Sequence, residues 1–244
     1  MPDDMMRVIC DAAVKNYPNE SCGVIVQSGK KSLTVECTNI AEQRQSNFMI
    51  SPRDYARAAE IGEIVGVWHT HVEIPPTPSA ADKSGCEKTR LPWYIVAVRK
   101  RGEKFEFEGP VVIHPTGFEM LYIGRPYVPC VFDCYTLVQD YYKREYDIEL
   151  SNYPYILEDE SPGHTALVNH YVREGFVRIH DETPIAGDVF MMQINTPLPS
   201  HLGLYLGDGV FMHHQHGRLS RKDVYGGYWA KHTTHHLRHK RLTK

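Results

Sequence analysis

The chain has 244 residues, of which 42% are hydrophobic and 23% are charged, and its formal net charge is -3 at pH 7. These values are ordinary for a soluble globular protein, and the length allows one or two domains. No stretch approaches about eighteen uninterrupted apolar residues, and the first seven residues are polar and acidic. We therefore expect neither a transmembrane segment nor a secretory signal.

The charge is distributed unevenly along the chain. Residues 218–244 carry eight Lys or Arg residues and one acidic residue, Asp223, which gives +7 there and -10 for the remainder. A basic segment can attract a nucleic acid or another anionic polymer, although a solvated face is the commoner explanation. The cysteines lack the regular spacing of a disulfide scaffold, which favours a reducing cytoplasm. They are Cys10, Cys22, Cys37, Cys86, Cys130 and Cys134.

The first half of the chain mixes predicted helices and strands. Gly29-Lys30 forms a hairpin turn, and Ser51-Pro52 indicates an N-cap followed by proline at the first helical position. This mixture predicts α+β or α/β layering for the first half. The predicted elements are a helix over 3–15, strands over 22–27 and 32–37, a helix over 51–60, a strand over 64–68, a helix after Ser79, and strands over 93–99 and 104–108.

A metal-binding pattern follows the strand over 64–68. His69 and His71 stand at its end, and alternation along a strand puts both imidazoles on one face, about 7 Å apart at Cα. A proline-rich loop follows, and Ser79 and Asp82 then form a capping box at the start of a helix. Two nitrogens and one carboxylate leave a position open for water, as in catalytic zinc sites. The alternative is that two core histidines stand near an ordinary capped helix.

The pattern H-T-H-x7-S-x-x-D, with an upstream glutamate in N-E-S-C-G-V-I, resembles the JAMM (MPN+) metalloprotease family over roughly residues 1–110. The resemblance implies a zinc cofactor with His69, His71 and Asp82 as ligands. It also implies Glu20 as general base to the zinc water and Ser79 as the group that steadies the oxyanion. Family members often carry Pro directly after the second His, whereas the prolines of this chain come later in the loop.

The domain boundary is expected near residue 115, because residues 109–129 are rich in Pro and Gly and lack a helical period. The predicted domains span 1–115 and 116–244. The second begins with a helix and continues with strands, which predicts an α+β domain. Its predicted elements are a helix over 134–145 capped by Asp133, a helix over 164–174, and strands over 188–193, 201–206 and 210–213, the last two joined by a hairpin turn at Gly207-Asp208-Gly209.

A second constellation surrounds Cys134, which opens a predicted helix where the positive end of the helix dipole favours thiolate over thiol. A nucleophilic cysteine needs a base, and the base needs an orienting partner. His201 opens one strand of the hairpin and His213 ends the other, so their rings can share a hydrogen bond. His214 is a rival for the orienting role, although alternation points it to the other face. Taken alone, Cys134 is more simply explained as core filling.

Three phrases in this order resemble the NlpC/P60 cysteine peptidases: F-D-C-Y-T-L-V, H-L-G-L-Y-L-G-D-G and F-M-H. The resemblance implies a papain-like fold with Cys134 as nucleophile, His201 as base and His213 as the orienting residue. It also implies that Tyr127 lies near the oxyanion hole. The family usually has D-C-S-G where this chain has D-C-Y-T, and it has several more residues between the tyrosine and the cysteine.

A JAMM-like domain followed by an NlpC/P60-like domain is similar to the tail assembly protein K family of lambda-like phages, over nearly the whole chain. We therefore expect an α+β fold of two domains, a JAMM-type zinc metalloprotease layer fold and then a papain-like NlpC/P60 fold. The resemblance implies a viral protein made in the host bacterial cytoplasm and acting at the virion tail tip. Its implied partners are other tail tip proteins and peptidoglycan stem peptides.

The leading hypothesis is a hydrolase with two peptidase sites, a zinc-water protease and a thiol endopeptidase. The alternative is a non-catalytic assembly or scaffolding factor whose vestigial peptidase domains serve as docking surfaces. The presence of every chemical residue favours activity. Nucleic-acid binding is not expected, because the basic segment has few stacking aromatic residues interleaved with its charges, namely Tyr225, Tyr228 and Trp229.

Overall fold

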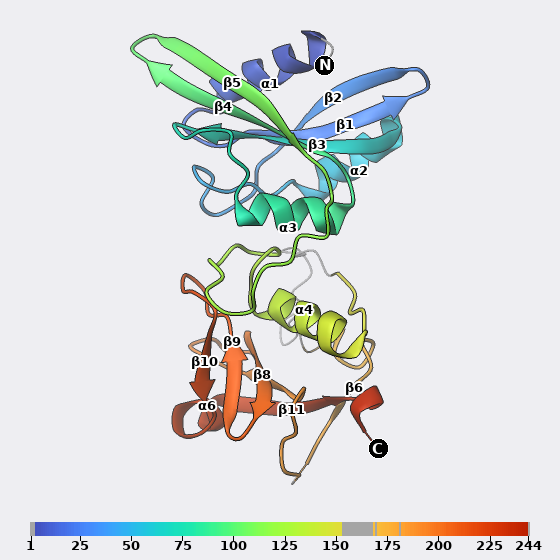
Figure 1. Ribbon diagram of the computed structural model, residues 1–244, viewed down its shortest axis with the longest axis vertical. Coiled ribbons are helices and arrows are strands. Elements are labelled where there is room, and N and C mark those ends of the chain that lie inside the picture. The colour runs from blue at the N-terminus through green and yellow to red at the C-terminus, as the bar shows by residue number, and fades with distance from the viewer. Residues whose placement is uncertain (1–2, 153–167, 169, 181, 244) are drawn as a thin grey trace. The chain divides into compact units, whose positions relative to one another are not determined.

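The structure is a computed structural model that describes residues 3–152, 168, 170–180 and 182–243. It is a mixed α+β protein, as expected, and it divides into two compact units, Met1–Glu119 and Met120–Lys244 (Figure 1). We call these the N-terminal unit and the C-terminal unit. The helix predicted over 164–174 falls partly outside the described residues, since 164–167 and 169 are not among them. Within the described ranges, no helix is both long enough and apolar enough to cross a membrane.

The N-terminal unit is built on a five-stranded sheet with strand order β2-β1-β3-β4-β5. Strands β3 and β4 run parallel, which requires a crossover connection, and α3 supplies it. The other neighbouring strands are antiparallel. The elements are α1 (Asp3–Asn16), β1 (Cys22–Ser28), β2 (Lys31–Cys37), α2 (Pro52–Ile61), β3 (Glu63–Val72), α3 (Ala80–Thr89), β4 (Trp93–Arg101) and β5 (Lys104–Ile113).

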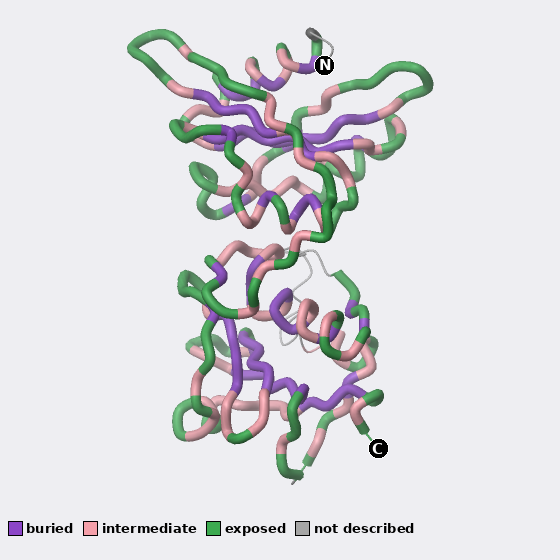
Figure 2. Tube along the Cα trace, viewed as in Figure 1, coloured by how far each residue is buried: buried purple, intermediate pink, exposed green. Residues whose placement is uncertain are grey.

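Helices cover both faces of this sheet, so the N-terminal unit has three layers (Figure 1). Side chains of α1 pack with Trp68 on one face, whereas α2 packs with Val24 and α3 packs with Val67 on the other. The buried residues are concentrated in the central strands (Figure 2). His69 and His71 follow Val67 by two and four positions and therefore point to the face that α3 covers.

The predicted helix caps are present, and two of them position site residues. Ser79 Oγ accepts the Asp82 backbone N–H at 3.1 Å, and the Asp82 carboxylate accepts the Ser79 N–H at 2.7 Å. Asp133 likewise caps α4 through the backbone N–H three residues further on, at 2.8 Å. A cap of this kind contributes about 1 kcal/mol. These caps fix Asp82 in the first turn of α3 and Cys134 at the first residue of α4.

The C-terminal unit contains an antiparallel six-stranded sheet with strand order β10-β9-β8-β7-β11-β6. The predicted hairpin is present as β8 and β9. No element was predicted over β6, β10, α6 or β11. The elements are α4 (Cys134–Tyr146), β6 (Phe176–Arg178), β7 (Val189–Met192), β8 (His201–Gly207), β9 (Val210–His213), β10 (Arg221–Val224), α6 (Gly227–His232), β11 (Thr233–His239) and the 3-10 helix η1 (Lys240–Leu242).

The two faces of this sheet carry different cores. Leu137 and Tyr142 of α4 pack on one face against aliphatic side chains such as Leu204. The opposite face carries an aromatic cluster that includes Phe211 and Trp229. The C-terminal unit therefore holds α4, and with it Cys134, against the strand that begins at His201.

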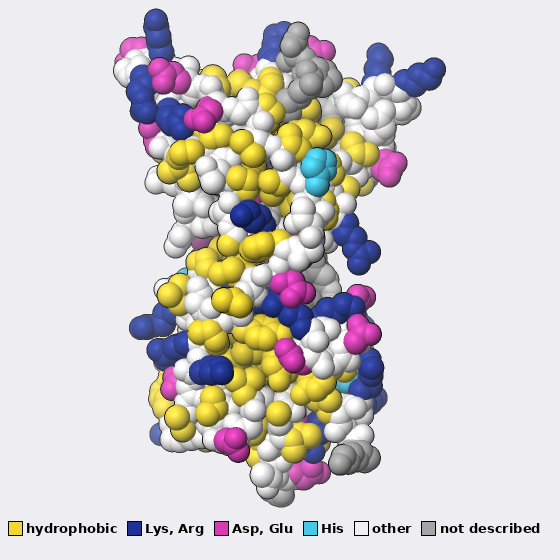
Figure 3. All heavy atoms as spheres, viewed as in Figure 1, with side chains coloured by type: hydrophobic (Ala, Val, Ile, Leu, Met, Phe, Trp, Pro, Cys, Tyr) yellow, Lys and Arg dark blue, Asp and Glu magenta, His cyan; other side chains and the backbone are white. Residues whose placement is uncertain are grey.

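The basic segment over 218–244 is folded into the sheet. Arg238 of β11 is buried, and its guanidinium donates to the fully buried Asp188 carboxylate at 2.8 and 2.9 Å and to Glu182 at 2.7 Å. This positive charge is neutralised inside the fold, where loss of one partner would cost about 3–5 kcal/mol. On the face in Figure 3, Lys and Arg side chains are interspersed with Asp and Glu.

Candidate active sites

Three buried side chains converge where β3 and α3 meet in the N-terminal unit. His69 Nε2 lies 3.1 Å from Asp82 Oδ1, and His71 Nε2 lies 3.4 Å from Asp82 Oδ2. One ligand atom from each residue lies within 4.8 Å of the others. The residues that the H-x-H and capping-box patterns indicated are thus brought together, and they could hold a metal ion.

The protonation of His69 and Asp82 suits a metal ligand set, whereas burial lowers the pKa of His71 less than its hydrogen bonds to Asp82 and Pro75 raise it. His71 Nδ1 lies 2.9 Å from the Pro75 carbonyl oxygen and can donate to it, which leaves the Nε2 lone pair directed toward Asp82. Burial lowers the pKa of His69 and keeps its ring neutral. Burial alone would raise the pKa of Asp82, but the adjacent imidazoles bring it well below its usual range. Neutral imidazole and ionised carboxylate are the forms that bind metals.

His69 also leaves hydrogen-bonding capacity unused. Among the described residues, neither of its buried ring nitrogens has a hydrogen-bond partner of suitable geometry, even though Nε2 is near Asp82. A buried polar group without a partner costs about 1–3 kcal/mol. A metal ion bound at this position would satisfy one nitrogen, so the residues present fit such an ion.

Glu20 and Ser79 stand beside the trio. Glu20 lies between α1 and β1, is 4% exposed, and is held through its backbone N–H, which donates to the Arg44 carbonyl at 2.7 Å. Burial is the main cause of a raised pKa of Glu20, His71 opposes the rise and Asp82 adds to it, and the resulting pKa is about 8. Ser79 is exposed, and its hydroxyl hydrogen remains available because the Oγ atom acts as an acceptor in the cap.

Two aromatic residues that no sequence motif indicated pack around His69. Phe48 stacks on the imidazole with ring centroids 4.4 Å apart, and Trp93 contacts it edge-on at 5.7 Å. Trp93 was expected only as the start of a strand. Phe48 lies in a segment with no predicted element, so no local signal could have placed it against His69.

In the C-terminal unit, Cys134 lies at the first residue of α4 and touches β8. The backbone of Leu202, the residue after His201, forms a hydrogen bond to the thiol. Burial raises the pKa of Cys134 to about 12, and the Asp133 carboxylate adds to the rise. The expectation of a thiolate at this helix start is therefore wrong, because desolvation and the neighbouring carboxylate outweigh the helix dipole.

The hydrogen bond expected between His201 and His213 is present. His201 Nε2 lies 3.0 Å from His213 Nδ1, and both rings are buried. Burial lowers the pKa of His201 to about 3 and that of His213 to about 4, so both rings are neutral at pH 7. His214 Nε2 instead lies 3.0 Å from the Arg218 carbonyl oxygen. His213, and not His214, is the partner of His201.

Tyr127 lies on the loop before α4. Its ring contacts His214 and His216, with centroid distances of 5.3 and 4.8 Å. The same loop is anchored by Arg125, which is fully buried and donates to Asp140 of α4 at 2.5 Å. Tyr127 is thus placed beside the residue that follows His213.

Residues of β10 and α6 that no sequence motif indicated lie around the histidine pair. The Trp229 ring lies 4.5 Å from the ring of His213. Arg221 Nε lies 3.5 Å from His213 Nε2, and Asp223 Oδ2 lies 3.8 Å from the same nitrogen. The contact of Arg221 and Asp223 with His213 depends on the pairing of β10 with β9, and the sequence from Arg221 to Asp223 matches no motif that would predict it.

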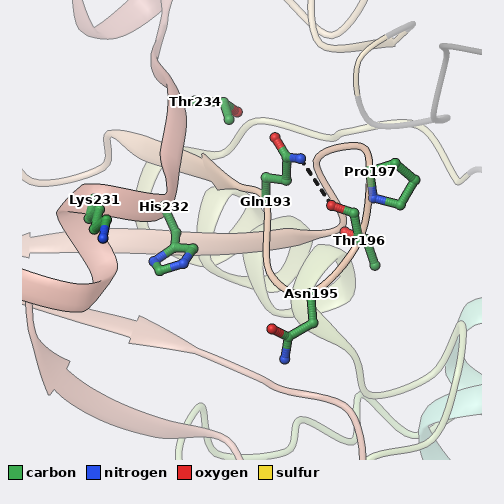
Figure 4. A pocket seen from close by; sticks show the side chains of 7 residues that line it. All are labelled: Gln193, Asn195, Thr196, Pro197, Lys231, His232 and Thr234. Atoms are coloured by element: carbon green, nitrogen blue, oxygen red, sulfur yellow. Dashed lines mark hydrogen bonds between the residues drawn. The ribbon is translucent and has the colours of Figure 1, made fainter.

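A pocket of about 460 Å³ lies at the end of the C-terminal sheet where β8 begins (Figure 4). Met192 of β7 pairs with His201 of β8 on one side and with Thr233 of β11 on the other. The lining residues Gln193 and Thr234 directly follow Met192 and Thr233, so the pocket lies next to the strand that begins at His201. The walls contain Lys231 and no acidic side chain, which suits a polar or anionic group. The lining residues are Gln193, Asn195, Thr196, Pro197, Lys231, His232 and Thr234.

Comparison with known proteins assigns each unit to a family. Residues 2–108 match the family described as prokaryotic homologs of the JAB domain, and residues 120–238 match the NlpC/P60 family. Desampylase of Pyrococcus furiosus is 27% identical over 108 residues, which cover 42% of this chain and 75% of that protein.

Two phage proteins match along most of the chain. Tail tip assembly protein K of Escherichia phage N15 is 34% identical over 231 residues, covering 93% of this chain and 91% of that protein. Tail tip assembly protein K of Escherichia phage lambda is 30% identical over 193 residues, covering 78% and 89%. With its JAB-like and NlpC/P60 domains in this order, the chain belongs to the phage tail tip assembly protein K family.

Proposed function

We propose that this protein is a hydrolase with two peptidase sites, a zinc-dependent protease in the N-terminal unit and a thiol endopeptidase in the C-terminal unit. The observation that carries the proposal is that each unit contains the groups that one hydrolytic chemistry needs. The first holds two imidazoles and a carboxylate within 4.8 Å of one another. The second holds a cysteine at a helix start and two hydrogen-bonded imidazoles, one on β8 and one on β9.

In the N-terminal unit, His69, His71 and Asp82 would hold one zinc ion, which when bound activates water and polarises the scissile carbonyl. Glu20, whose raised pKa of about 8 leaves only a minority of the carboxyl ionised at pH 7, acts as general base in its carboxylate form: it takes a proton from the attacking water and returns it to the leaving amine. Ser79 donates its hydroxyl hydrogen to the oxygen on which negative charge develops. The unpartnered nitrogens of His69 and the buried carboxyl of Glu20 support these roles.

In the C-terminal unit, Cys134 carries its proton at neutral pH, so the attack requires a base. His201 takes the thiol proton at Nδ1, since its Nε2 is bonded to His213, while the sulfur forms a bond to the substrate carbonyl carbon. The imidazolium then protonates the departing amine, leaving a thioester. His201 next deprotonates a water molecule that hydrolyses this thioester and restores the thiol. Tyr127 is proposed near the oxyanion.

The proposed substrate of the C-terminal unit is a stem peptide of bacterial peptidoglycan. The wall polymer is anionic, and the exposed Lys222 of β10 and Lys231 of α6 would raise its local concentration. The polar pocket with Lys231 at this end of the sheet suits a peptide carboxylate. For the N-terminal unit, we propose a protein substrate, and the relative named desampylase supports a hydrolytic role.

The names of the two phage relatives describe tail tip assembly. We propose that this chain likewise acts with other tail tip proteins, in the host cytoplasm during assembly and at the virion tail tip. These names also favour a second candidate function, an assembly factor that keeps both units as docking surfaces without catalysis. The protonated state of Cys134 is compatible with a site that has no catalytic activity.

Metal analysis of the purified full chain tests the first site. We expect one zinc per chain, lost in His69→Ala, His71→Ala and Asp82→Ala, because three ligands cannot lose one without a large drop in affinity. Cys134→Ala, in the other unit, is the matched control and should keep its zinc. A chain without zinc, or zinc retained in all three ligand variants, would contradict the metal site and favour the assembly factor.

A further inference from the structure

The pocket at the start of β8 has two walls that come from different parts of the C-terminal unit (Figure 4). One wall is the loop between β7 and β8, with Gln193, Asn195 and Thr196, and the other is the end of α6, with Lys231 and His232. The Gln193 backbone N–H donates to the His232 carbonyl oxygen at 2.9 Å, which joins the two walls. The volume of about 460 Å³ falls in the range of small-ligand pockets, roughly 300–1,000 Å³.

The pocket is close to His201 of the thiol site. The Thr196 hydroxyl lies 2.9 Å from the hydroxyl of Ser200, the residue before His201. Met192 is in register with His201, and Gln193 follows Met192. Because a strand rises about 3.3 Å per residue, the pocket begins about one residue beyond the level of His201. A peptide of a few residues can therefore reach His201 and the pocket at the same time.

The positive charge in the pocket is not neutralised by the protein. Among the described residues, the exposed ammonium group of Lys231 forms neither an ion pair nor a hydrogen bond. By contrast, the ammonium group of Lys143 in the same unit lies 3.1 Å from Asp147 and 2.9 Å from Glu149. The pocket walls also contain no acidic side chain. The charge of Lys231 is thus available to an anionic ligand.

Two polar side chains of the pocket add further hydrogen-bonding groups. Asn195 has a φ of 52°, a left-handed conformation that asparagine tolerates, and its side-chain amide has no hydrogen-bond partner in the described part of the chain. His232 Nδ1 donates to the Tyr228 carbonyl oxygen at 2.7 Å, so Nε2 of the neutral ring can accept from a peptide N–H. The amide of Asn195 and the ammonium group of Lys231 are donors, and a carboxylate can accept from both.

We propose that this pocket is a specificity subsite of the thiol peptidase, which binds a free carboxylate of the peptide substrate through Lys231 and Asn195. Lys231 is the specificity-determining residue, because its charge distinguishes a carboxylate from an uncharged carboxamide of similar shape. The inference deepens the proposed function of the C-terminal unit and rests on it for the effect on cleavage. Binding of the carboxylate itself does not require a reactive thiol.

The expected preference is modest because Lys231 is exposed to solvent. An ion pair in contact with water contributes little, so the carboxylate form should bind on the order of three- to fivefold more tightly than the carboxamide form. Added salt should reduce the preference. The pocket holds the substrate equally before and during the reaction, so the preference should change KM and leave kcat nearly unchanged.

Cleavage kinetics of the full chain measure the effect on the reaction. The substrates are a peptidoglycan stem peptide and forms of it in which one free carboxylate at a time is converted to a carboxamide. For one of these carboxylates, amidation should raise KM three- to fivefold in wild type and leave it unchanged in Lys231→Gln, and Lys231→Arg should restore the difference. Lys240→Gln is the matched control. It removes the same charge about 20 Å away, beyond the other end of β11, and should keep the wild-type preference.

Binding to a full chain that carries Cys134→Ala separates the pocket from the activity. Titration with the same peptides, followed by NMR through the side-chain amide of Asn195, should show tighter binding of the carboxylate form, and Lys231→Gln in this background should remove the preference. Equal binding of the stem peptide and every amidated form would overturn the proposal, as would an equal loss of preference in Lys231→Gln and Lys240→Gln. If wild type cuts no stem peptide but Cys134→Ala shows the preference, the proposed activity fails and the carboxylate site stands. If wild type cuts every form with the same KM, the activity stands and the carboxylate site fails.

Discussion

At the scale of single residues, burial controls the protonation state of the thiol site before any reaction. It raises the pKa of Cys134 to about 12 and lowers the pKa of His201 to about 3. Both partners are consequently neutral at pH 7, and a preformed thiolate and imidazolium pair is disfavoured. The reactivity of the sulfur must then depend on a base that receives the proton during the attack.

Replacement of this base gives the first prediction. His201→Ala should lower the rate of Cys134 alkylation by about a hundredfold, because a positioned general base contributes at least that factor. Mass mapping of labelled peptides measures the rate, and the partly exposed Cys10 of the N-terminal unit serves as the internal reference. An unchanged rate at Cys134 would mean that His201 is not its base.

The second prediction separates the proton carrier of the metal site from its ligands. Glu20→Gln should keep the bound metal and lose protease turnover by about a hundredfold or more, since an amide cannot accept the proton. Asp82→Asn, as the comparison, should lose the metal as well. Metal content and turnover are measured on the same preparations. Loss of metal in Glu20→Gln would instead reassign Glu20 as a ligand.

At the scale of elements, the metal site depends on how closely α3 approaches the sheet. Gly85 permits this approach, because an added Cβ would lie 2.3 Å from the Trp93 ring. Trp93 in turn contacts His69, and Asp82 lies one turn before Gly85 on the same helix. A small change in the helix position would therefore alter both the ligand geometry and the packing around His69.

Gly85→Ala provides the third prediction. It should push α3 away from β4, destabilise the N-terminal unit by about 1–3 kcal/mol through overpacking, and lower metal affinity at least about tenfold. Competition with a chelator measures the affinity. Lys83→Ala, at an exposed position of the same helix, is the control and should bind metal normally. Equal affinities in the two variants would show that the helix position does not limit the site.

The elements also show what local sequence can and cannot predict. The strand with His69 and His71, the capping box of Asp82 and the β8–β9 hairpin each have a short-range pattern, and the structure contains all three. Strand β11, T-T-H-H-L-R-H, lacks alternating apolar residues and is stabilised by pairing with β7 and β6 and by the buried contact of Arg238 with Asp188.

The same limit applies to the candidate sites. Alternation along β3 and the cap of α3 bring the three metal-site residues together, so their convergence could be predicted. Phe48 reaches His69, and the Arg221–Asp223 pair reaches His213, only through tertiary contacts between distant segments. The expectation of a thiolate at Cys134 was wrong because the desolvation of the thiol depends on how the core packs around it. This packing cannot be predicted from the local sequence.

At the scale of the whole molecule, each unit has its own core and its own pH response. The C-terminal unit contains His201 and His213, whose pKa values burial lowers to about 3 and about 4. Below their ordinary pKa of about 6.5, the unfolded chain binds protons that the folded unit excludes. The stability contributed by these neutral rings is complete above pH 6.5 and decreases as the pH falls toward 4.

The fourth prediction follows from this loss of stability at acidic pH. Between pH 7 and pH 5, the C-terminal unit should lose about 2 kcal/mol of unfolding free energy per buried ring. Urea unfolding, followed through the NMR methyl signals of Met191 and Met192, measures it in the buried strands of this unit. Replacement of both histidines by Gln should flatten the profile. A wild-type stability that is constant between pH 7 and pH 5 would contradict the neutral, buried state of the pair.

The claim that one chain carries two independent hydrolytic sites is tested most directly by mass spectrometry of its products. The full chain, His69→Ala and Cys134→Ala are each incubated with purified peptidoglycan and with tail tip proteins. We predict that wild type releases stem-peptide fragments and cuts a tail protein, that Cys134→Ala loses only the wall fragments, and that His69→Ala loses only the protein cleavage. The wall fragments should decrease with added salt. Identical products from all three proteins, each shown to be folded, would contradict the account and favour a non-catalytic assembly factor.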